Sequence, residues 1–369
     1  MSELDVGEIY RCTPRQVREY TIDVLAAGLV PFIQSDPGMG KSAIVRSIAQ
    51  QANVKMIDHR LSTSSSVDMS GLPEFYTDED GHRRARFVPF DIFPLKNTKK
   101  PDGYNGWLLF LDEANSATKQ VQAASYKTVL DKAVGQYDLH PDLGIVLAGN
   151  LMTSGAIVNV LSTAMQSRLI HLEMVLNHEE WLQDVALKEN YDFRIIAYLS
   201  FKKAALMDFR PDHNEKTFCC PRTWEFVNKM VKGRKDLSNK IPLLAGTITS
   251  GEAASFVTFC AIQEDIPDVK AILANPKTEA IPGDSQALWM VITHLAESTT
   301  KENFSKLCEY INRLPLQFRI LYFKSCMIRL PVLRQQPEYA KAMAELDRYL
   351  NAPTHGAGAY VSIPPSLTP

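Results

Sequence analysis

The stretch Ser35–Ser42, which reads Ser-Asp-Pro-Gly-Met-Gly-Lys-Ser, constrains this chain more than any other feature. An apolar run typical of a strand precedes it over residues 29–34, and a helical pattern follows over residues 41–51. A glycine-containing loop between a strand and a helix is the setting of a phosphate-binding loop. Its glycines let backbone N–H groups turn onto phosphate oxygens, and the helix N-terminus adds partial positive charge. The stretch therefore predicts a nucleotide-binding α/β unit.

The side chains of this loop have separate expected roles. We expect Lys41 to reach the β- and γ-phosphates of ATP and the Ser42 hydroxyl to ligate Mg²⁺. Ser35 stands where the pattern GxxxxGKS begins with glycine, so its backbone needs a negative φ. The alternative is a chance G-x-G-K-S loop without a ligand. The residues expected to contact the nucleotide are Asp36, Pro37, Gly38, Met39, Gly40, Lys41, Ser42 and Ala43.

Acidic and amide side chains end two further apolar runs. Trp107–Leu111 leads into Asp112 and Glu113, and residues 143–148 lead to Asn150. We expect Asp112 to hold Mg²⁺, mainly through its water shell, and Glu113 to orient and deprotonate an attacking water. Asn150 can hydrogen-bond that water or a γ-phosphate oxygen. The alternatives are a strand that meets solvent and a turn-forming asparagine, and the upstream loop favours the catalytic interpretation.

The first half of the chain alternates strand and helix patterns, which predicts a parallel sheet with crossover connections. Thr13 and Pro14 are typical of a helix start, and the turn signal Asp78–Gly81 predicts an inserted β-hairpin near residues 75–95. The expected strands are 29–34, 54–59, 107–111 and 143–148, with helices over 41–51 and 121–132.

Beyond about Met174 the sequence is predicted to be mostly helical. The expected helices are 177–189, 193–207, 222–233, 248–263, 284–298, 302–313, 315–329 and 337–350. Residues 356–369 are rich in Gly, Ser and Pro and are expected to form a disordered tail.

These residues resemble a known family. The loop at 35–42, Asp112-Glu113 and Asn150 are similar to the Walker A, Walker B and sensor 1 elements of AAA+ ATPases. The run from Asp112 to Ala117, with the Phe87-Val88-Pro89 segment, resembles the MoxR-like and dynein-related branch of bacterial or phage type. Three departures from the pattern remain: Ser35 for glycine, Ser116 for arginine and Ser167 for an acid.

The resemblance implies roles for two arginines. Arg168 is similar to the arginine finger, which stabilises charge on the γ-phosphate bound by a neighbouring subunit. Arg222, in Cys220-Pro221-Arg222-Thr223, is similar to sensor 2, which contacts phosphate in its own subunit. The alternatives are a surface ion pair for Arg168 and a helix-start arginine paired with an acid such as Glu225 for Arg222.

The resemblance also implies an organisation and a function. The expected fold is an α/β, AAA+ P-loop αβα core with a parallel sheet (1–174), an α-helical lid (175–263) and a helical C-terminal extension (264–355). The expected cofactors are ATP and Mg²⁺, and the expected assembly is a homo-oligomer, a hexamer. Relatives remodel or activate a protein client together with a von Willebrand factor A-type partner, so the expected function is a chaperone-like ATPase motor.

Charge leaves a second function open. The hairpin region contains His82, Arg83, Arg84 and Arg86, followed by Lys96, Lys99 and Lys100, which suits either a solvated face or nucleic acid. The rival function is therefore a nucleic-acid-stimulated motor, a translocase or the motor subunit of a restriction-type nuclease. A nucleotide-switched scaffold is a third alternative, against which the intact Glu113 argues.

The composition bears on the binding partners of the protein and on its cellular compartment. The 40 basic and 42 acidic residues leave a net charge of −2, so the whole chain has no strong attraction to nucleic acid or to a membrane surface. No apolar run approaches the roughly 20 residues of a membrane span. The six cysteines are expected to be reduced thiols, and the protein to be cytoplasmic.

Overall fold

The computed structural model describes residues 11–155 and 158–350, which form two compact units. Unit 1 comprises residues 11–177 and 207–223, and unit 2 comprises residues 178–206 and 224–350. Residues 207–223, expected in a lid, thus belong to unit 1. The division of the helical part into a lid and an extension stays a prediction, and the expected tail lies outside the described residues.

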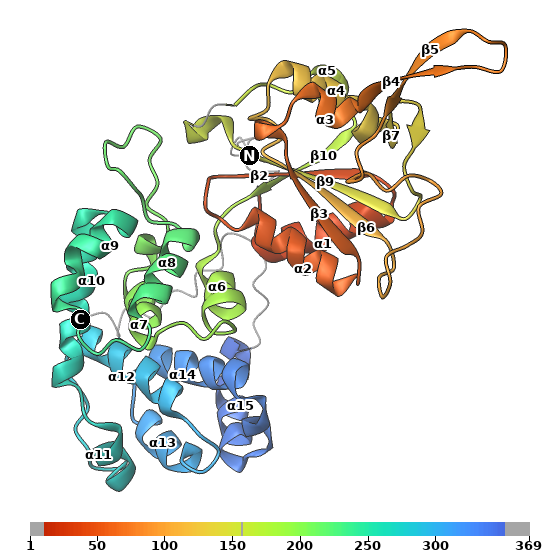
Figure 1. The fold of residues 1–369 in the computed structure, drawn as a ribbon. Coiled ribbons are helices and arrows are strands. Elements are labelled where there is room, and N and C mark those ends of the chain that lie inside the picture. The colour runs from red at the N-terminus through yellow and green to blue at the C-terminus, as the bar shows by residue number, and fades with distance from the viewer. Residues whose placement is uncertain (1–10, 156–157, 351–369) are drawn as a thin grey trace, which may run out of the picture. The chain divides into compact units, whose positions relative to one another are not determined.

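A six-stranded, all-parallel sheet forms the centre of unit 1 (Figure 1). In spatial order its strands are β1 (Arg11–Cys12), β10 (Leu169–Met174), β2 (Val30–Ser35), β9 (Leu143–Asn150), β6 (Trp107–Asp112) and β3 (Lys55–Arg60). The four strands expected from the sequence are therefore present, each within one or two residues. The sheet confirms the predicted α/β fold class.

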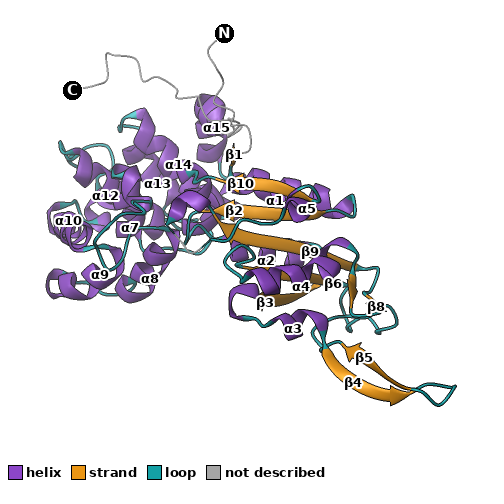
Figure 2. Cartoon of the chain, turned by 90° about the horizontal axis from the view of Figure 1, so that it is seen from above, coloured by secondary structure: helices purple, strands orange, loops and turns teal. Residues whose placement is uncertain are grey.

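Helices cover both faces of this sheet, as Figure 2 shows from above. They are α1 (Pro14–Ala26), α2 (Lys41–Gln51), α3 (Ser66–Ser70), α4 (Lys119–Leu130) and α5 (Thr163–Gln166). Val17 and Val45, from α1 and α2, pack with Phe110 on one face. Val121 and Met165, from α4 and α5, join the core on the other face. Successive strand residues point to opposite faces, so the fully buried β6 serves both cores.

The first helix begins where its sequence signals predicted. The Thr13 side chain accepts a hydrogen bond from Gln16 N, and the Gln16 side chain accepts one from Thr13 N. This capping box satisfies two backbone donors that a helix start leaves open, and Pro14 at the first position has no N–H to satisfy. The helix ends at Ala26, two residues before Gly28, whose φ is +75°.

Pro31 lies in the middle of the sheet, a position where proline is rare. It is paired in register with Ile170 of β10, whereas pairing of β2 with β9 begins one residue later at Phe32. The proline therefore precedes the part of β2 that has neighbours on both sides. This explains how the strand tolerates a residue without an N–H group.

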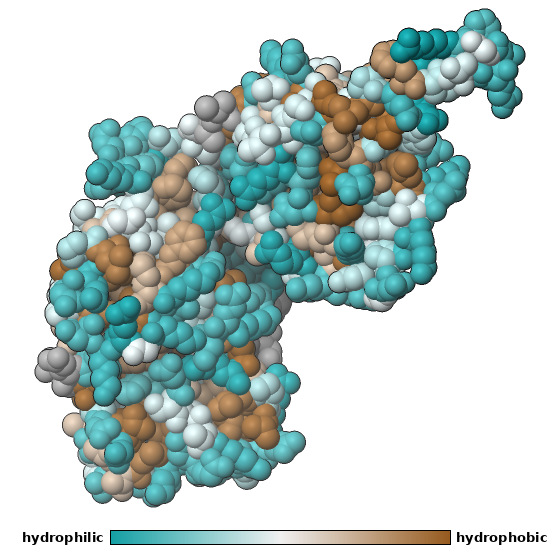
Figure 3. Space-filling view, viewed as in Figure 1, coloured by the Kyte–Doolittle hydropathy of each residue, from teal (hydrophilic) through white to brown (hydrophobic). Residues whose placement is uncertain are grey.

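Two antiparallel hairpins accompany the α/β core. The expected insert is β4 (Leu72–Thr77) paired antiparallel with β5 (Arg83–Val88), slightly earlier in the chain than predicted. A second, unexpected hairpin, β7 (Ala133–Val134) and β8 (Tyr137–Asp138), follows α4. All twelve strand residues of the first hairpin are exposed. It extends from the core at the upper right of Figure 3 and carries both hydrophobic and hydrophilic residues.

Unit 2 is helical. Its helices are α6 (His178–Trp181), α7 (Phe193–Phe201), α8 (Pro221–Val231, whose first turn lies in unit 1), α9 (Ile241–Ile248), α10 (Ser250–Ala261), α11 (Val269–Ala274), α12 (Ser285–Ser298), α13 (Phe304–Ile311), α14 (Leu316–Arg329) and α15 (Pro337–Leu350). The helix expected over 177–189 is interrupted, because α6 gives way to a π-helical turn over Leu182–Ala186. The sequence missed α9 and α11.

Aromatic side chains form the core of unit 2. The Tyr198, Trp224 and Phe256 rings contact one another pairwise, with centroids 5.3 to 5.8 Å apart, and all three are buried. Such edge and tilted contacts are the preferred aromatic geometries. All six cysteines lie among the described residues, and all six are buried. No helix of the described residues is long and apolar enough to cross a membrane.

Candidate functional site

The sheet topology brings the predicted site residues to one edge. β2, β9 and β6 are neighbours and run in the same direction, so their carboxyl ends meet. Ser35 is in register with Asn150, and Asp112 is in register with Arg60 at the end of β3. The carboxyl edge of a parallel sheet is where α/β proteins bind ligands.

The loop between β2 and α2 has the backbone of a phosphate cradle. Gly38 and Gly40 have φ of +79° and +89°, a region that side chains other than glycine rarely adopt. Gly38 is also packed closely: an added Cβ would lie 2.3 Å from the Cys220 sulfur. Ser35 is buried at the end of β2 and has no positive φ, so serine is compatible with the turn. The first N–H groups of α2 remain available to an anion.

Lys41 lies at the centre of the site. Its Nζ donates to Ser35 O (3.2 Å), Ser35 Oγ (3.0 Å), Asp36 O (3.4 Å) and Asn150 Oδ1 (3.2 Å). The Ser35 hydroxyl donates its own hydrogen to Asp36 O, which leaves its lone pairs to Lys41. The serine at the first loop position thus adds an acceptor for the lysine that glycine would not provide.

Burial lowers the pKa of Lys41 to about 8, against the attraction of the Asp112 carboxylate. The Arg222 guanidinium lowers the pKa of Lys41 further, and Asp36 and Glu113 raise it. Lys41 therefore carries its charge at neutral pH but loses it in mildly alkaline solution. The structure also brings Arg222 to the loop, since its backbone N–H donates to Gly38 O (3.2 Å).

Two oxygen ligands suited to Mg²⁺ lie side by side. Ser42 Oγ donates to Asp112 Oδ2 at 3.2 Å, and the second Asp112 oxygen accepts from Glu113 N at 2.8 Å. Hydroxyl, carboxylate and water oxygens are the ligands that Mg²⁺ prefers, so the residues present fit the predicted metal. Each oxygen of the Asp112 carboxylate therefore accepts one hydrogen bond, which fixes the orientation of the side chain.

Glu113 has an unusual backbone. Its φ of +55° is uncommon for a residue with a side chain, and such strain is often found at functional sites. Its carboxylate is half-buried and accepts a hydrogen bond from Ser62 Oγ. Ser62 lies just past β3, so the carboxyl ends of β3 and β6 both contribute to the site.

Asn115 and Asn150 are joined through a pair of hydrogen bonds. Asn115 Nδ2 donates to Asn150 O (2.7 Å), and Asn150 N donates to Asn115 Oδ1 (3.1 Å). Asn115 is only 3% exposed. The segment after Asn150 is attached to the loop as well, because Ser154 Oγ donates to Asp36 Oδ1 (2.6 Å).

Arg168 is the one expected site residue that the structure places elsewhere. It is exposed between α5 and β10, and its Nη1 donates to Ala164 O (3.1 Å). The next residue, Leu169, is in register with Val30, at the amino end of β2. Six residues at about 3.3 Å each put Arg168 roughly 20 Å from the loop of its own chain.

Sequence reasoning missed Ser62, Ser154, Cys220 and the pairing of Asn115 with Asn150 as parts of the site. Ser62 lies in a polar run (residues 62–66) that matches no motif, and Cys220 appears only within the segment that resembles sensor 2. Asn115 had a signal, since it closely follows the carboxylate pair. Its partner, however, lies on a strand whose neighbour in the sheet cannot be read from one sequence.

No protein-family model and no curated protein matches this sequence. Solved structures do match. A point mutant of RuvB from Thermotoga maritima is 16% identical and covers 90% of this chain and 88% of its own, with a TM-score of 0.33. A structure described as the Thermotoga maritima RuvB Holliday junction branch migration motor is also 16% identical and covers 81% and 85%, with a TM-score of 0.34.

NtrX from Brucella abortus is a third match, at 15% identity and a TM-score of 0.32, and covers 91% of this chain and 67% of its own. TM-scores below 0.5 at such identities do not assign the chain to any of these proteins' families. The case for a function therefore rests on the site: a lysine, a hydroxyl, two carboxylates and an amide gathered at the carboxyl edge of a parallel sheet.

Proposed function

We propose that this chain is an ATP-hydrolysing motor of the AAA+ type. The observation that carries the proposal is the meeting of the Lys41 ammonium with Asn150 Oδ1 at 3.2 Å, beside the contact of Ser42 with Asp112. These four groups come from two neighbouring strands, β9 and β6, and one helix, α2. A phosphate cradle, a metal-ligand pair and a carboxylate beside them are the parts that phosphoryl transfer to water requires.

Each group has a separate task in this proposal. Lys41 and the first N–H groups of α2 neutralise the phosphate oxygens, and Arg222 adds charge from the adjacent segment. Glu113 accepts the proton of the attacking water, and Asn150 orients that water or a γ-phosphate oxygen. Ser42 and Asp112 would hold Mg²⁺, which supplies further positive charge to the phosphates.

The position of Arg168 supports a site shared between subunits. At roughly 20 Å from its own loop, it cannot contact a phosphate bound there. An exposed arginine at the opposite edge of the sheet is available to a neighbouring copy, where it would stabilise the transferred phosphoryl group. We therefore propose a homo-oligomer, a hexamer, in which each copy completes its neighbour's site.

The resemblance stated from the sequence supports the finer assignment. We propose a MoxR-like chaperone motor that remodels or activates a client together with a von Willebrand factor A-type protein. The hairpin of β4 and β5 favours a protein partner over nucleic acid, since Arg84 pairs with Asp78 and Arg86 with Glu74. With Glu79 and Asp80 at the turn, the hairpin's acids balance its arginines.

The nucleic-acid alternative can be tested separately. We expect DNA or RNA to leave the ATPase rate unchanged in the wild type and in an Arg83→Ala, Arg84→Ala, Arg86→Ala variant. A salt-sensitive stimulation by nucleic acid that this variant abolishes would favour the rival motor instead.

The experiment that tests the proposed function compares binding with hydrolysis. Glu113→Gln removes the proton acceptor but keeps the size of the side chain, so we expect ATP binding to persist while Mg²⁺-dependent hydrolysis falls by about 10² or more. Lys41→Ala is expected to lose binding. Undiminished hydrolysis in Glu113→Gln would contradict the assignment of the general base.

A further inference from the structure

Asn115 bears a side chain whose function the nucleotide chemistry above does not explain. Its position follows the end of β6, and its side chain extends across to the end of β9, the adjacent strand. Backbone pairing between the two strand ends stops at Ala114, whose N–H donates to Ala148 O at 2.8 Å. Beyond Ala114 the side-chain amide of Asn115 replaces the backbone pairing, because it forms hydrogen bonds with both the C=O and the N–H of Asn150.

A side-chain amide suits this task because it reproduces a peptide group, with one carbonyl acceptor and N–H donors in a plane. The two bonds also define its orientation, since Asn150 N can only donate and Asn150 O can only accept. Aspartate has no donor, and alanine has neither group. Among the common side chains, asparagine is therefore specifically matched to this position.

The surrounding residues hold this contact in place. Gly149 leaves room for it, because an added Cβ there would lie 2.3 Å from Asn115 Oδ1. In the loop before α5, Asn159 N donates to Asn115 O (2.6 Å), and Asn159 Nδ2 donates to Ala117 O (2.8 Å). On its other side the strand end is attached to β2 through Leu151 N and Ser35 O at 3.3 Å.

We propose that Asn115 is a positioning residue for hydrolysis: it fixes the backbone of Asn150 so that the Asn150 side chain points at Lys41 and the γ-phosphate site. This inference rests on the proposed function and adds to it a residue that acts only through another. A small displacement of Asn150 Oδ1 would misplace the water or phosphate oxygen it orients, and such errors lower rates steeply.

The test is a double-mutant cycle on the full-length chain with ATP and Mg²⁺. We expect Asn115→Ala and Asn150→Ala each to lower kcat by about tenfold or more, while KM and the Kd for ATP change little. The double variant is expected to be no slower than Asn150→Ala alone, because Asn115 acts through Asn150. Asn105→Ala is the matched control, since Asn105 Nδ2 also donates to a backbone oxygen (Ala52 O, 3.0 Å), at the amino edge of the same sheet.

A second variant separates positioning from a general loss of structure. Asn115→Asp keeps the acceptor for Asn150 N, but its ionised carboxylate repels Asn150 O. When protonated, the new carboxyl can donate again, so the kcat of Asn115→Asp relative to the wild type is expected to rise as the pH falls. Asn115 also borders a cavity of about 400 Å³, so water can reach the groups that Asn115→Ala leaves bare, and the fold is expected to persist.

The outcomes distinguish this inference from the proposed function. If the wild type hydrolyses ATP and Asn115→Ala keeps its kcat, the positioning role is overturned while the ATPase assignment stands. Losses that multiply in the double variant, or a loss of ATP binding in Asn115→Ala, would likewise overturn it. If the wild type hydrolyses no nucleotide, the proposed function falls, and this inference falls with it.

Discussion

At the scale of single residues, the proposed binding of phosphate depends on the charges and hydrogen-bond acceptors around the Lys41 ammonium. Its pKa of about 8 results from burial, which disfavours the charge, and from nearby carboxylates that favour it. Four oxygen atoms accept from Nζ, among them the Ser35 hydroxyl. The hydrogen bonds to these four oxygens fix the position of the Lys41 ammonium, whereas its burial makes the ammonium easier to deprotonate than that of an exposed lysine.

The first prediction concerns pH. Because phosphate binding needs the protonated form of Lys41, we expect the Kd for ATP to be constant below about pH 8. Above that pH we expect the Kd to rise about tenfold per pH unit. Lys41→Arg keeps its charge at all these pH values, so its affinity should not fall in this range. Ser35→Ala removes one acceptor and is expected to move the fall to lower pH. An ATP affinity that stays constant between pH 7 and pH 10 would contradict this account of Lys41.

The second prediction concerns the two loop glycines. Gly38→Ala and Gly40→Ala each force a side chain into a positive φ, at a cost of about 1–2 kcal/mol. Only Gly38→Ala also places a Cβ against the Cys220 sulfur, whereas Gly40 has open space. We therefore expect Gly38→Ala to lower the melting temperature and ATP binding more. Adding Cys220→Ala should recover part of that loss and should not help Gly40→Ala.

Which residues of the site could be predicted depends on whether their signal is local in the sequence. The loop, Asp112, Glu113 and Asn150 follow their strands directly, so local order and spacing were enough to find them. Ser62 and the pairing of Asn115 with Asn150 depend on which strands are neighbours. That order is a property of the folded sheet, which local patterns do not encode.

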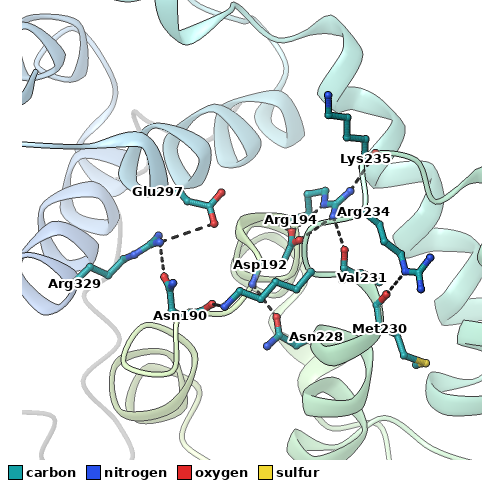
Figure 4. A network of polar contacts seen from close by, with 11 residues as sticks. Asn190, Asp192, Arg194, Asn228, Met230, Val231, Arg234, Lys235, Glu297 and Arg329 are labelled. Carbon is teal, nitrogen blue, oxygen red and sulfur yellow. Dashed lines mark hydrogen bonds and ion pairs between the residues drawn. The ribbon is translucent and has the colours of Figure 1, made fainter.

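At the scale of elements, a buried ion pair joins the helices of unit 2 (Figure 4). Asp192 and Arg194 lie at the start of α7 and are only 5% and 3% exposed. Arg194 Nη2 is 2.8 Å from Asp192 Oδ2. Arg194 also donates to Val231 O at the end of α8, and Asn228 Oδ1 accepts from Asp192 N (2.8 Å). The pair thus supplies hydrogen bonds that hold α7 against α8.

The third prediction tests this pair. Arg194→Met leaves the buried Asp192 carboxylate without its positively charged partner, so we expect the free energy of unfolding to fall by about 3–5 kcal/mol. Asp192→Asn combined with Arg194→Met removes both charges and should cost less. Lys99→Met, which breaks an exposed pair with Asp102, is the control and should change stability little. Denaturant unfolding of the four proteins gives the comparison, and equal losses in the single and double variants would argue against the explanation.

Element prediction succeeded where the local pattern was strong. The expected helix at 284–298 corresponds to α12 (Ser285–Ser298), and the capping signals located the start of α1. The strand β10 was missed because its sequence, Leu-Ile-His-Leu-Glu-Met, mixes polar and apolar residues. Its pairing with both β1 and β2 determines its conformation, and pairing of this kind is a tertiary property.

At the scale of the whole molecule, the proposal requires more than one copy of the chain. The groups proposed to bind and attack the nucleotide lie at the carboxyl edge of the sheet, and Arg168 lies near the amino edge. In the proposed mechanism a single copy therefore cannot bring Arg168 to its own nucleotide. An assembly of copies in which opposite edges meet would supply it.

The fourth prediction is complementation between two inactive variants. Lys41→Ala has no phosphate-binding lysine but keeps Arg168, and Arg168→Ala has the reverse defect. Mixed oligomers contain some sites with both groups, so we expect the mixture to recover part of the wild-type ATPase rate that neither variant shows alone. Arg168→Lys is the control for charge without the planar guanidinium. A mixture as inactive as its components would indicate that Arg168 does not act between subunits.

The most direct test of the central claim is the steady-state rate of ATP hydrolysis, measured against protein concentration in the wild type and in Glu113→Gln. We predict that wild-type specific activity rises with concentration, as copies associate, and that Glu113→Gln stays near the background at every concentration. Wild-type protein that binds ATP with Mg²⁺ but releases no phosphate at any concentration would contradict the account.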